Sequence, residues 1–299
     1  MFKKTILIGA LLTTAAFAKI SVFVTVFPLY DAAKSIAGDK AEVSSLIPFG
    51  APAHDFEPKA KDMAMLSKSD LFITSGEGFE PWSKKVISSL GIKNKTIDMS
   101  TKVKLLKPQN TSGGHDHHGH EHSHAAYDPH YWLNIDNQIR IAKETASAFS
   151  KKDPQNTKFY NDRASLYIAK LTELKKEYET LRGCKNKKVI VNHNAFGYLS
   201  SEYGITQYTI SGMSPDAKPS SKQIARLIDI AKKEKINTVF FEEFASDKVA
   251  KTIAKEANIK TDALRPIENI TPDESRKNIG YIDIMRSNLA KLKGAMDCR

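Results

Sequence analysis

The feature that most constrains the fold is an alternation of short apolar segments with amphipathic helical segments, which occurs twice along the chain. Such alternation is typical of parallel βαβ units, because a crossover helix returns the chain to the start of the next parallel strand. We therefore expect an α/β protein with two lobes, each built on a parallel sheet. The expected strands are 20–26, 71–75, 96–99, 187–192, 207–211, 238–242 and 260–264, and the expected helices are 30–37, 79–90, 220–235, 247–258 and, after a capping box, 271–295.

A long helical segment separates the two runs. Residues 134–150 and 154–181 have helical periodicity, and apolar residues recur at spacings of three and four along the second of them. At 1.5 Å per residue, about 28 residues extend roughly 40 Å, which is longer than one small lobe needs. We expect this helix to run along both lobes. The expected domains are an N-terminal lobe over 19–150, a spanning helix over 151–182 and a C-terminal lobe over 183–299.

The first 18 residues have the features of a secretory signal peptide. Lys3 and Lys4 precede a short apolar stretch, and Ala16-Phe17-Ala18 fits an A-x-A cleavage site. The stretch is too short to span a bilayer, and no cysteine stands at the cleavage point. We therefore expect a signal peptide over 1–18 and an exported protein with no lipid anchor and no stable membrane insertion.

The formal net charge of +11 raises nucleic acid as a partner, because basic surfaces attract phosphate. The 45 Lys and Arg residues are, however, mixed with 34 Asp and Glu residues along the whole chain. No basic stripe is interleaved with aromatic residues, so we do not expect nucleic-acid binding.

The chain has two cysteines, Cys184 and Cys298, which are too few for a disulfide scaffold or a Cys-based zinc motif. In an oxidising compartment an even pair favours a disulfide, and two inert buried thiols are the alternative. The sequence alone does not supply the geometry that a disulfide requires.

A histidine-rich tract over 113–124 interrupts the first half of the chain. It contains six of the nine histidines together with Asp116 and Glu121. Its glycines and composition predict a loop rather than a helix or strand. The string His120-Glu121-His122-Ser123-His124 matches the H-E-x-x-H zinc-protease motif, but that motif requires a helix, so we reject the protease interpretation. The tract is either a secondary zinc-binding loop or a solvated linker, and its histidines are His115, His117, His118, His120, His122 and His124.

The remaining histidines are His54, His130 and His193, and each lies where a strand or loop leads into a helix. In open α/β sheets, ligands bind beyond the carboxyl ends of the strands. Three imidazoles brought there from two lobes suit a zinc ion. The sequence has no phosphate-binding loop and no nucleophile elbow, so we expect no catalysis.

Five motifs make the chain resemble the zinc-specific solute-binding proteins of bacterial ABC importers, the ZnuA family. The resemblance covers essentially the whole chain after the signal peptide. The motifs are His-Asp-Phe-Glu-Pro at 54–58, Asp-Pro-His-Tyr-Trp-Leu-Asn at 128–134, Asn-His-Asn-Ala-Phe-Gly-Tyr-Leu at 192–199, Phe-Glu-Glu at 241–243 and Pro-Ile-Glu at 266–268.

The resemblance implies two lobes joined by a long helix, with Zn(II) held in the cleft between them by His54, His130 and His193. Manganese-binding relatives carry Glu at the third position, so His193 indicates zinc. For the fourth ligand, Glu268 and a water molecule both remain open. Some relatives carry Asp where this chain has Arg265. Carboxylates that could orient the imidazoles are Asp55, Glu57, Glu242 and Glu243.

The function that the resemblance implies is zinc uptake. A monomeric periplasmic receptor would capture zinc and deliver it to an inner-membrane ABC permease, without acting as an enzyme. The alternatives are a manganese or iron receptor, a metal-binding adhesin of the same fold, and a secreted zinc hydrolase. The histidine-rich tract would then either gather scarce zinc for the cleft or report zinc excess.

Overall fold

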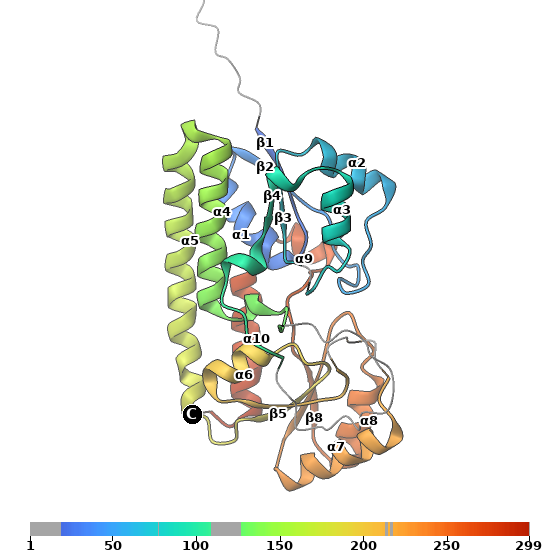
Figure 1. The fold of residues 1–299 in the computed structure, drawn as a ribbon. Helices are drawn as coiled ribbons and strands as arrows, with labels where there is room; N and C mark the ends of the chain where they lie inside the picture. The colour runs from blue at the N-terminus through green and yellow to red at the C-terminus, as the bar shows by residue number, and fades with distance from the viewer. Residues whose placement is uncertain (1–18, 77, 109–126, 213–214, 216–217, 299) are drawn as a thin grey trace, which may run out of the picture.

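The computed structural model describes residues 19–76, 78–108, 127–212, 215 and 218–298. The expected signal peptide and the histidine-rich tract lie outside these residues. The described part contains two four-stranded sheets in which every pair of neighbouring strands is parallel. The predicted α/β class with two parallel-sheet lobes is therefore confirmed (Figure 1).

The first sheet has the strand order β2-β1-β3-β4. Its order places β1 beside β3, so the carboxyl ends of these two strands form the crevice where α/β sheets bind ligands. The strands are β1 (Ile20–Val24), β2 (Ala41–Ser45), β3 (Leu71–Thr74) and β4 (Thr96–Asp98), and the helices of this lobe are α1 (Phe27–Ala37), α2 (Ala60–Lys68) and α3 (Ser83–Ser89), with 3-10 turns η1 (Lys93–Lys95) and η2 (Met99–Lys102).

The second sheet repeats this arrangement with the order β6-β5-β7-β8. Its strands are β5 (Lys188–Val191), β6 (Thr206–Thr209), β7 (Thr238–Phe241) and β8 (Lys260–Ala263), and its helices are α6 (Gly197–Tyr203), α7 (Ser221–Lys233) and α8 (Lys248–Ala257). The sequence patterns did not reveal β2, α2 or α6. These elements are short, and β2 (AEVSS) and α2 (AKDMAMLSK) lack clear apolar periodicity.

Two antiparallel helices lie beside the first lobe, and the second of them reaches the second lobe (Figure 1). The 3-10 turn η3 (Tyr131–Leu133) leads into α4 (Ile135–Lys152), and η4 (Pro154–Asn156) leads into α5 (Thr157–Tyr178), which ends in η5 (Glu179–Gly183). Helix α5 runs beside the first lobe and reaches the second (Figure 1). Its buried residues recur at the expected spacings of three and four: Tyr160, Ala164, Tyr167, Leu171, Leu174 and Tyr178.

The single final helix expected over 271–295 is wrong, because the structure divides it into α9 (Pro272–Arg276) and α10 (Tyr281–Ala295). Asn278 has φ of +55°, a left-handed conformation that asparagine tolerates better than most residues. The N–H of Ile279 then donates to the Glu274 carbonyl at 3.0 Å, which closes α9. The helical pattern restarts at Gly280, and α10 crosses between the lobes (Figure 1).

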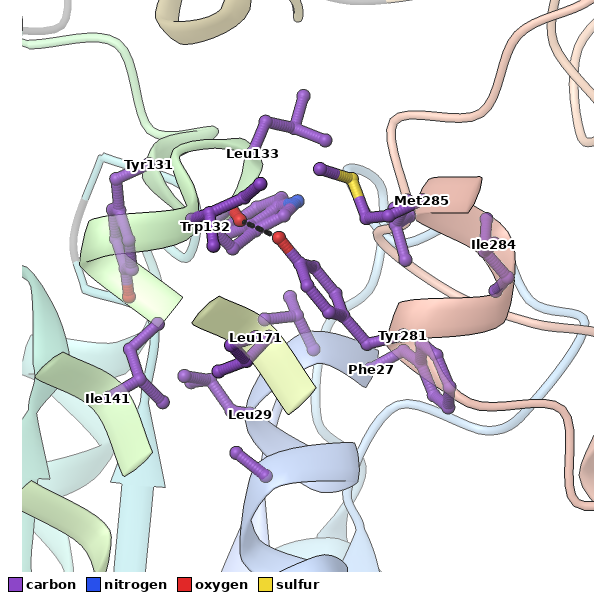
Figure 2. Packing of buried hydrophobic residues seen from close by; sticks show 14 of the residues in the cluster. Phe27, Leu29, Tyr131, Trp132, Leu133, Ile141, Leu171, Tyr281, Ile284 and Met285 are labelled. Carbon is purple, nitrogen blue, oxygen red and sulfur yellow. Dashed lines mark hydrogen bonds between the residues drawn. The ribbon is translucent and has the colours of Figure 1, made fainter. Parts of the chain in front are cut away.

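The main core includes residues from both halves of the chain. Side chains from α1, η3, α5 and α10 pack against one another in Figure 2, where the Tyr281 hydroxyl donates to the Trp132 carbonyl at 2.6 Å. The domain ranges stay a prediction, and the shared core shows that the last helix also packs against the first half.

The predicted disulfide between Cys184 and Cys298 is present. It joins the segment that precedes β5 to the short C-terminal segment that follows α10. None of the helices in the described part of the chain combines the length and the apolar character needed to cross a membrane.

Candidate metal site

Four side chains from four separate loops converge between the lobes. His54 lies between β2 and α2, His130 directly precedes η3, His193 lies two residues after β5, and Glu268 lies between β8 and α9. One donor atom from each lies within 4.8 Å of the donor atoms of the others. The three predicted histidines and the uncertain carboxylate are thus in one group.

Four of the six distances between the donor atoms are close to the spacing of a tetrahedral zinc site. Glu268 Oε1 lies 2.8 Å from His54 Nε2, 3.2 Å from His130 Nε2 and 3.5 Å from His193 Nε2. The Nε2 atoms of His130 and His193 are 3.2 Å apart. Zinc bound at 2.0–2.1 Å in a tetrahedron places its ligand atoms about 3.3 Å apart. Only small movements would therefore admit the ion.

Two buried carboxylates orient the imidazoles from behind. Asp128 Oδ1 accepts from both the backbone N–H of His130 at 2.9 Å and its ring Nδ1 at 2.8 Å. Glu242 Oε1 lies 2.6 Å from His193 Nδ1. Because Nδ1–H is used by the carboxylate, Nε2 of each ring is directed to the metal, which is the usual arrangement behind ligating histidines.

The position of Glu242 follows from the second sheet. His193 comes after β5 and Glu242 comes directly after β7, and these strands are neighbours. After β5 the chain forms β6 on one side of β5, and it later forms β7 on the other side. Parallel sheets bind ligands in the crevice at such a reversal of strand order, and the contact between His193 and Glu242 spans this crevice.

The other carboxylates suggested by sequence lie elsewhere. Asp55 and Glu57 are exposed, and within the described residues neither belongs to the group of donor atoms. Glu243 forms an ion pair with Arg265 at 3.0 Å. Arg265, at the position where some relatives carry a ligand, also binds Glu274. The sequence analysis missed Asp128, although its place two residues before His130 was the available indication.

Protonation of the buried histidines competes with metal binding at this site. Burial opposes a charge on His193, but the Glu242 and Glu268 carboxylates raise its pKa to about 10. Burial also opposes a charge on His130, and Asp128 and Glu268 raise its pKa as well. Burial alone would raise the pKa of Glu268, yet the surrounding histidines hold it well below its usual range. Binding of zinc would therefore displace protons from His130 and His193.

The site is closed on one side and reached from the other. Phe79 packs on His54 with ring centroids 4.6 Å apart, and Trp132 lies 5.6 Å from the His130 ring. His130 and His193 are fully buried. A pocket at the surface is lined by His54 and Glu268, together with Pro52, Phe244 and Arg265. An ion entering through this pocket would meet His54 and Glu268 first.

The family model for ZnuA, described as "Zinc-uptake complex component A periplasmic", matches residues 22–295. This chain belongs to the ZnuA family. The resemblance seen in the five motifs is therefore confirmed.

Two similar proteins are named for zinc uptake or zinc binding. The high-affinity zinc uptake system protein ZnuA of Bacillus subtilis is 39% identical over 280 residues, which cover 93% of this chain and 88% of that protein. The zinc-binding lipoprotein AdcA of Streptococcus pneumoniae is 38% identical over 282 residues, 93% of this chain and 56% of AdcA. This chain thus spans about half the length of the AdcA relatives it matches.

The fold agrees with a zinc-bound relative. The crystal structure of the Zn(II)-bound ZnuA-like domain of Streptococcus pneumoniae AdcA matches 94% of this chain and 100% of that domain. The TM-score is 0.80 at 35% identity.

Proposed function

We propose that this chain is the zinc-binding receptor of an ABC uptake system, which captures Zn(II) in the periplasm and delivers it to an inner-membrane permease. The observation that carries the proposal is the convergence of three imidazole nitrogens and one carboxylate oxygen within 4.8 Å. The zinc-uptake relatives and the family description support the same function.

The donor set favours zinc over manganese. Imidazole suits zinc, whereas carboxylate and water oxygens suit manganese. Three of the four donors are nitrogens, and the Asp128 and Glu242 carboxylates keep their rings in the orientation needed for Nε2 coordination. His54, His130, His193 and Glu268 are the proposed ligands, and Zn(II) is the proposed cargo.

Four protein ligands favour capture over catalysis. A catalytic zinc keeps a coordination position open for water or substrate, whereas this donor set fills a tetrahedron. The predicted signal peptide and the disulfide support an oxidising compartment outside the cytoplasm, in accord with the periplasm. We propose that the receptor acts as a monomer and that it binds no nucleic acid.

The test is zinc binding by the chain without residues 1–18 and without the histidine-rich tract, so that only the cleft contributes. Competition against a chelator should give one tight zinc equivalent, and elemental analysis after dialysis against mixed Zn, Mn, Cu and Ni should find zinc. Replacing His130, His193 or Glu268 by Ala should each weaken binding strongly, because each supplies a donor atom.

Asp55→Ala is the matched control, because this exposed carboxylate is adjacent to His54 but outside the donor group. It should leave the affinity unchanged. Failure of the parent protein to bind one tight zinc would contradict the proposed function. A variant with unchanged affinity would remove that residue from the ligand set.

A further inference from the structure

The turn between β8 and α9 has an unusual backbone at Ile267. Its φ of +64° lies in the left-handed region, which a β-branched side chain strongly disfavours. Such a conformation is energetically unfavourable and persists only where the surrounding structure holds it. The Ile267 side chain is buried in the main core. The next residue is Glu268, so the strained turn determines how this carboxylate enters the site.

Three hydrogen bonds connect the turn to the first half of the chain. The indole Nε1–H of Trp132 donates to the Pro266 carbonyl at 2.8 Å. The N–H of Phe27 donates to the Glu268 carbonyl at 3.0 Å, and the N–H of Gly50 donates to the Ile270 carbonyl at 2.8 Å. Although the turn follows the last strand of the second sheet, its backbone is bound to the first lobe.

Asn269 adds a connection to the loop that carries His54. Its side-chain Nδ2 donates to the carbonyls of Pro48 and Ala51, each at 2.8 Å. Its Oδ1 accepts from the N–H of Ile270 at 2.9 Å, and the residue is only 4% exposed. Asn269 is adjacent to Glu268, and Ala51 precedes His54 by three residues. One buried amide therefore joins the two loops that carry the partly exposed donors.

We propose that Asn269 is a positioning residue for the metal site. Its amide holds the His54 loop against the strained turn, so that His54 Nε2 and Glu268 Oε1 form one unit carried by the first lobe. The inference rests on the proposed function, because it concerns the same site. It goes further by assigning control of two ligands to a residue that contributes no donor atom.

If the lobes were to move apart, this arrangement would determine which ligand leaves the others. His193 is carried by the second sheet directly after β5, whereas the pair of His54 and Glu268 is bound to the first lobe. Separation would remove His193 from the ion first. Asn269 keeps the remaining pair together, and its loss should increase the rate of zinc release.

Asn269→Ala is the decisive variant. Loss of a group that is hydrogen-bonded directly to a metal ligand typically weakens affinity about 10–100-fold. Asn269 bonds the backbone of the His54 loop rather than a ligand side chain, so we expect a loss at the lower end of this range, about 10-fold, together with faster zinc dissociation. The visible absorption of Co(II) placed in the site should also change, because it responds to ligand geometry. A purely structural role would lower the melting temperature without altering the Co(II) spectrum.

Asn186→Ala is the matched control. The Asn186 amide likewise bridges two carbonyls, those of Glu234 and Lys235, but it precedes β5 and so lies at the opposite edge of the second sheet from His193. It should leave zinc affinity and the Co(II) spectrum unchanged. If Asn269→Ala does not fold, Asn269→Ser is measured instead, since its hydroxyl can still donate to one carbonyl. We expect an intermediate loss for Asn269→Ser.

A double-mutant cycle with Glu268→Ala separates positioning from a general effect. If Asn269 acts through Glu268, the two affinity losses should be less than additive, whereas independent sites add. Wild-type affinity and spectrum in Asn269→Ala, or in Asn269→Ser if that is the folded variant, would overturn the inference, as would strictly additive losses. Absence of zinc binding in the parent protein would instead overturn the proposed function.

Discussion

At the residue scale, two carboxylates that contact Nδ1 of the imidazoles determine the protonation and orientation of His130 and His193. Asp128 and Glu242 favour the protonated histidines while the metal is absent, and they fix the ring orientation when it is present. Metal binding requires neutral imidazole, so the same contacts couple zinc capture to pH.

Zinc binding should release protons near neutral pH. The pKa of His193 is raised to about 10, because the Glu242 and Glu268 carboxylates outweigh the opposing effect of burial. The ring is therefore protonated at pH 7 in the metal-free site, and zinc must displace that proton. Affinity should fall as pH is lowered. Calorimetry in buffers of different ionisation enthalpy measures the number of protons released.

Glu242→Gln provides the comparison for this prediction. Without the Glu242 carboxylate, the pKa of His193 should be lower, so fewer protons should be released at pH 7. A proton count that is the same in both proteins would contradict the assigned coupling.

Another buried carboxylate, that of Glu80, lies at the carboxyl end of the first sheet. Glu80 is 1% exposed and accepts from the Thr74 hydroxyl and from the N–H of Gly76 at 3.1 Å. Burial raises its pKa to about 7, although hydrogen bonds from Thr25, Thr74 and the backbone act in the opposite direction. It occupies the crevice beyond β1 and β3, where other α/β proteins bind ligands.

Glu80 should make the stability of the metal-free protein depend on pH. Because its folded pKa lies above the ordinary value of 4.5, its protonated form favours folding, and this contribution is lost as pH rises from about 4.5 through about 7. The free energy of unfolding should fall relative to Glu80→Gln by up to about 3 kcal/mol over this window. Urea unfolding of both proteins at several pH values measures it.

The matched control is Glu173→Gln, at an exposed ion pair with Lys176 on α5. Its stability relative to the wild type should change little over the same pH range. A difference between the wild type and Glu80→Gln that is constant with pH would show that Glu80 does not titrate in this way.

At the scale of elements, a hydrogen bond and a disulfide connect the end of α5 and the segment after it to α10 and the segment after it. The Tyr178 hydroxyl at the end of α5 donates to the Met285 carbonyl of α10 at 2.7 Å. The disulfide joins Cys184, which follows α5 and η5, to Cys298, which follows α10, across a sequence separation of 114. Both contacts hold α10 against the start of the second lobe.

Replacing both cysteines by serine should lower the free energy of unfolding by up to about 4–5 kcal/mol, because a long loop is no longer closed in the unfolded chain. Denaturant unfolding of the variant and of the wild type measures the loss. Zinc affinity should not change, since Cys184 precedes β5 whereas His193 follows it. A strong loss of zinc affinity would show that the bond also shapes the site.

At the scale of the whole molecule, the histidine-rich tract over 113–124 lies outside the described residues, and its role stays a prediction. Ordering a loop of six imidazoles around zinc has an entropic cost, so each binding mode should be weaker than the preformed cleft. Deleting residues 114–124 should remove at least one weak zinc equivalent and leave the tight site unchanged. Titration against a competing chelator measures both classes of site.

Replacing the six histidines of the tract by serine is the control for loop length. It should have the same effect as the deletion if the imidazoles bind the metal. Loss of the tight equivalent in either variant would show that the tract supplies a primary ligand.

The sequence by itself predicted the class of fold and three of the four residues in the candidate metal site. Strand and helix periodicities are local properties, so they predicted the two parallel sheets and the apolar face of α5 without knowledge of contacts. His54, His130 and His193 could be singled out because they are the only histidines of the sequence outside the tract, and each lies where a strand or loop leads into a helix.

Only the tertiary structure decided how the fourth donor reaches the site. Glu268 could not be distinguished from a water ligand in the sequence, because its position depends on a left-handed Ile267 that residue preferences argue against. Trp132, Phe27 and the loop that precedes His54 all form hydrogen bonds with this turn, although they are distant from it along the chain. The contact of Asp128 Oδ1 with the His130 ring also came from the structure, although the position of Asp128 two residues before His130 was visible in the sequence. Long-range packing thus overrides local preference at the place where the two lobes meet.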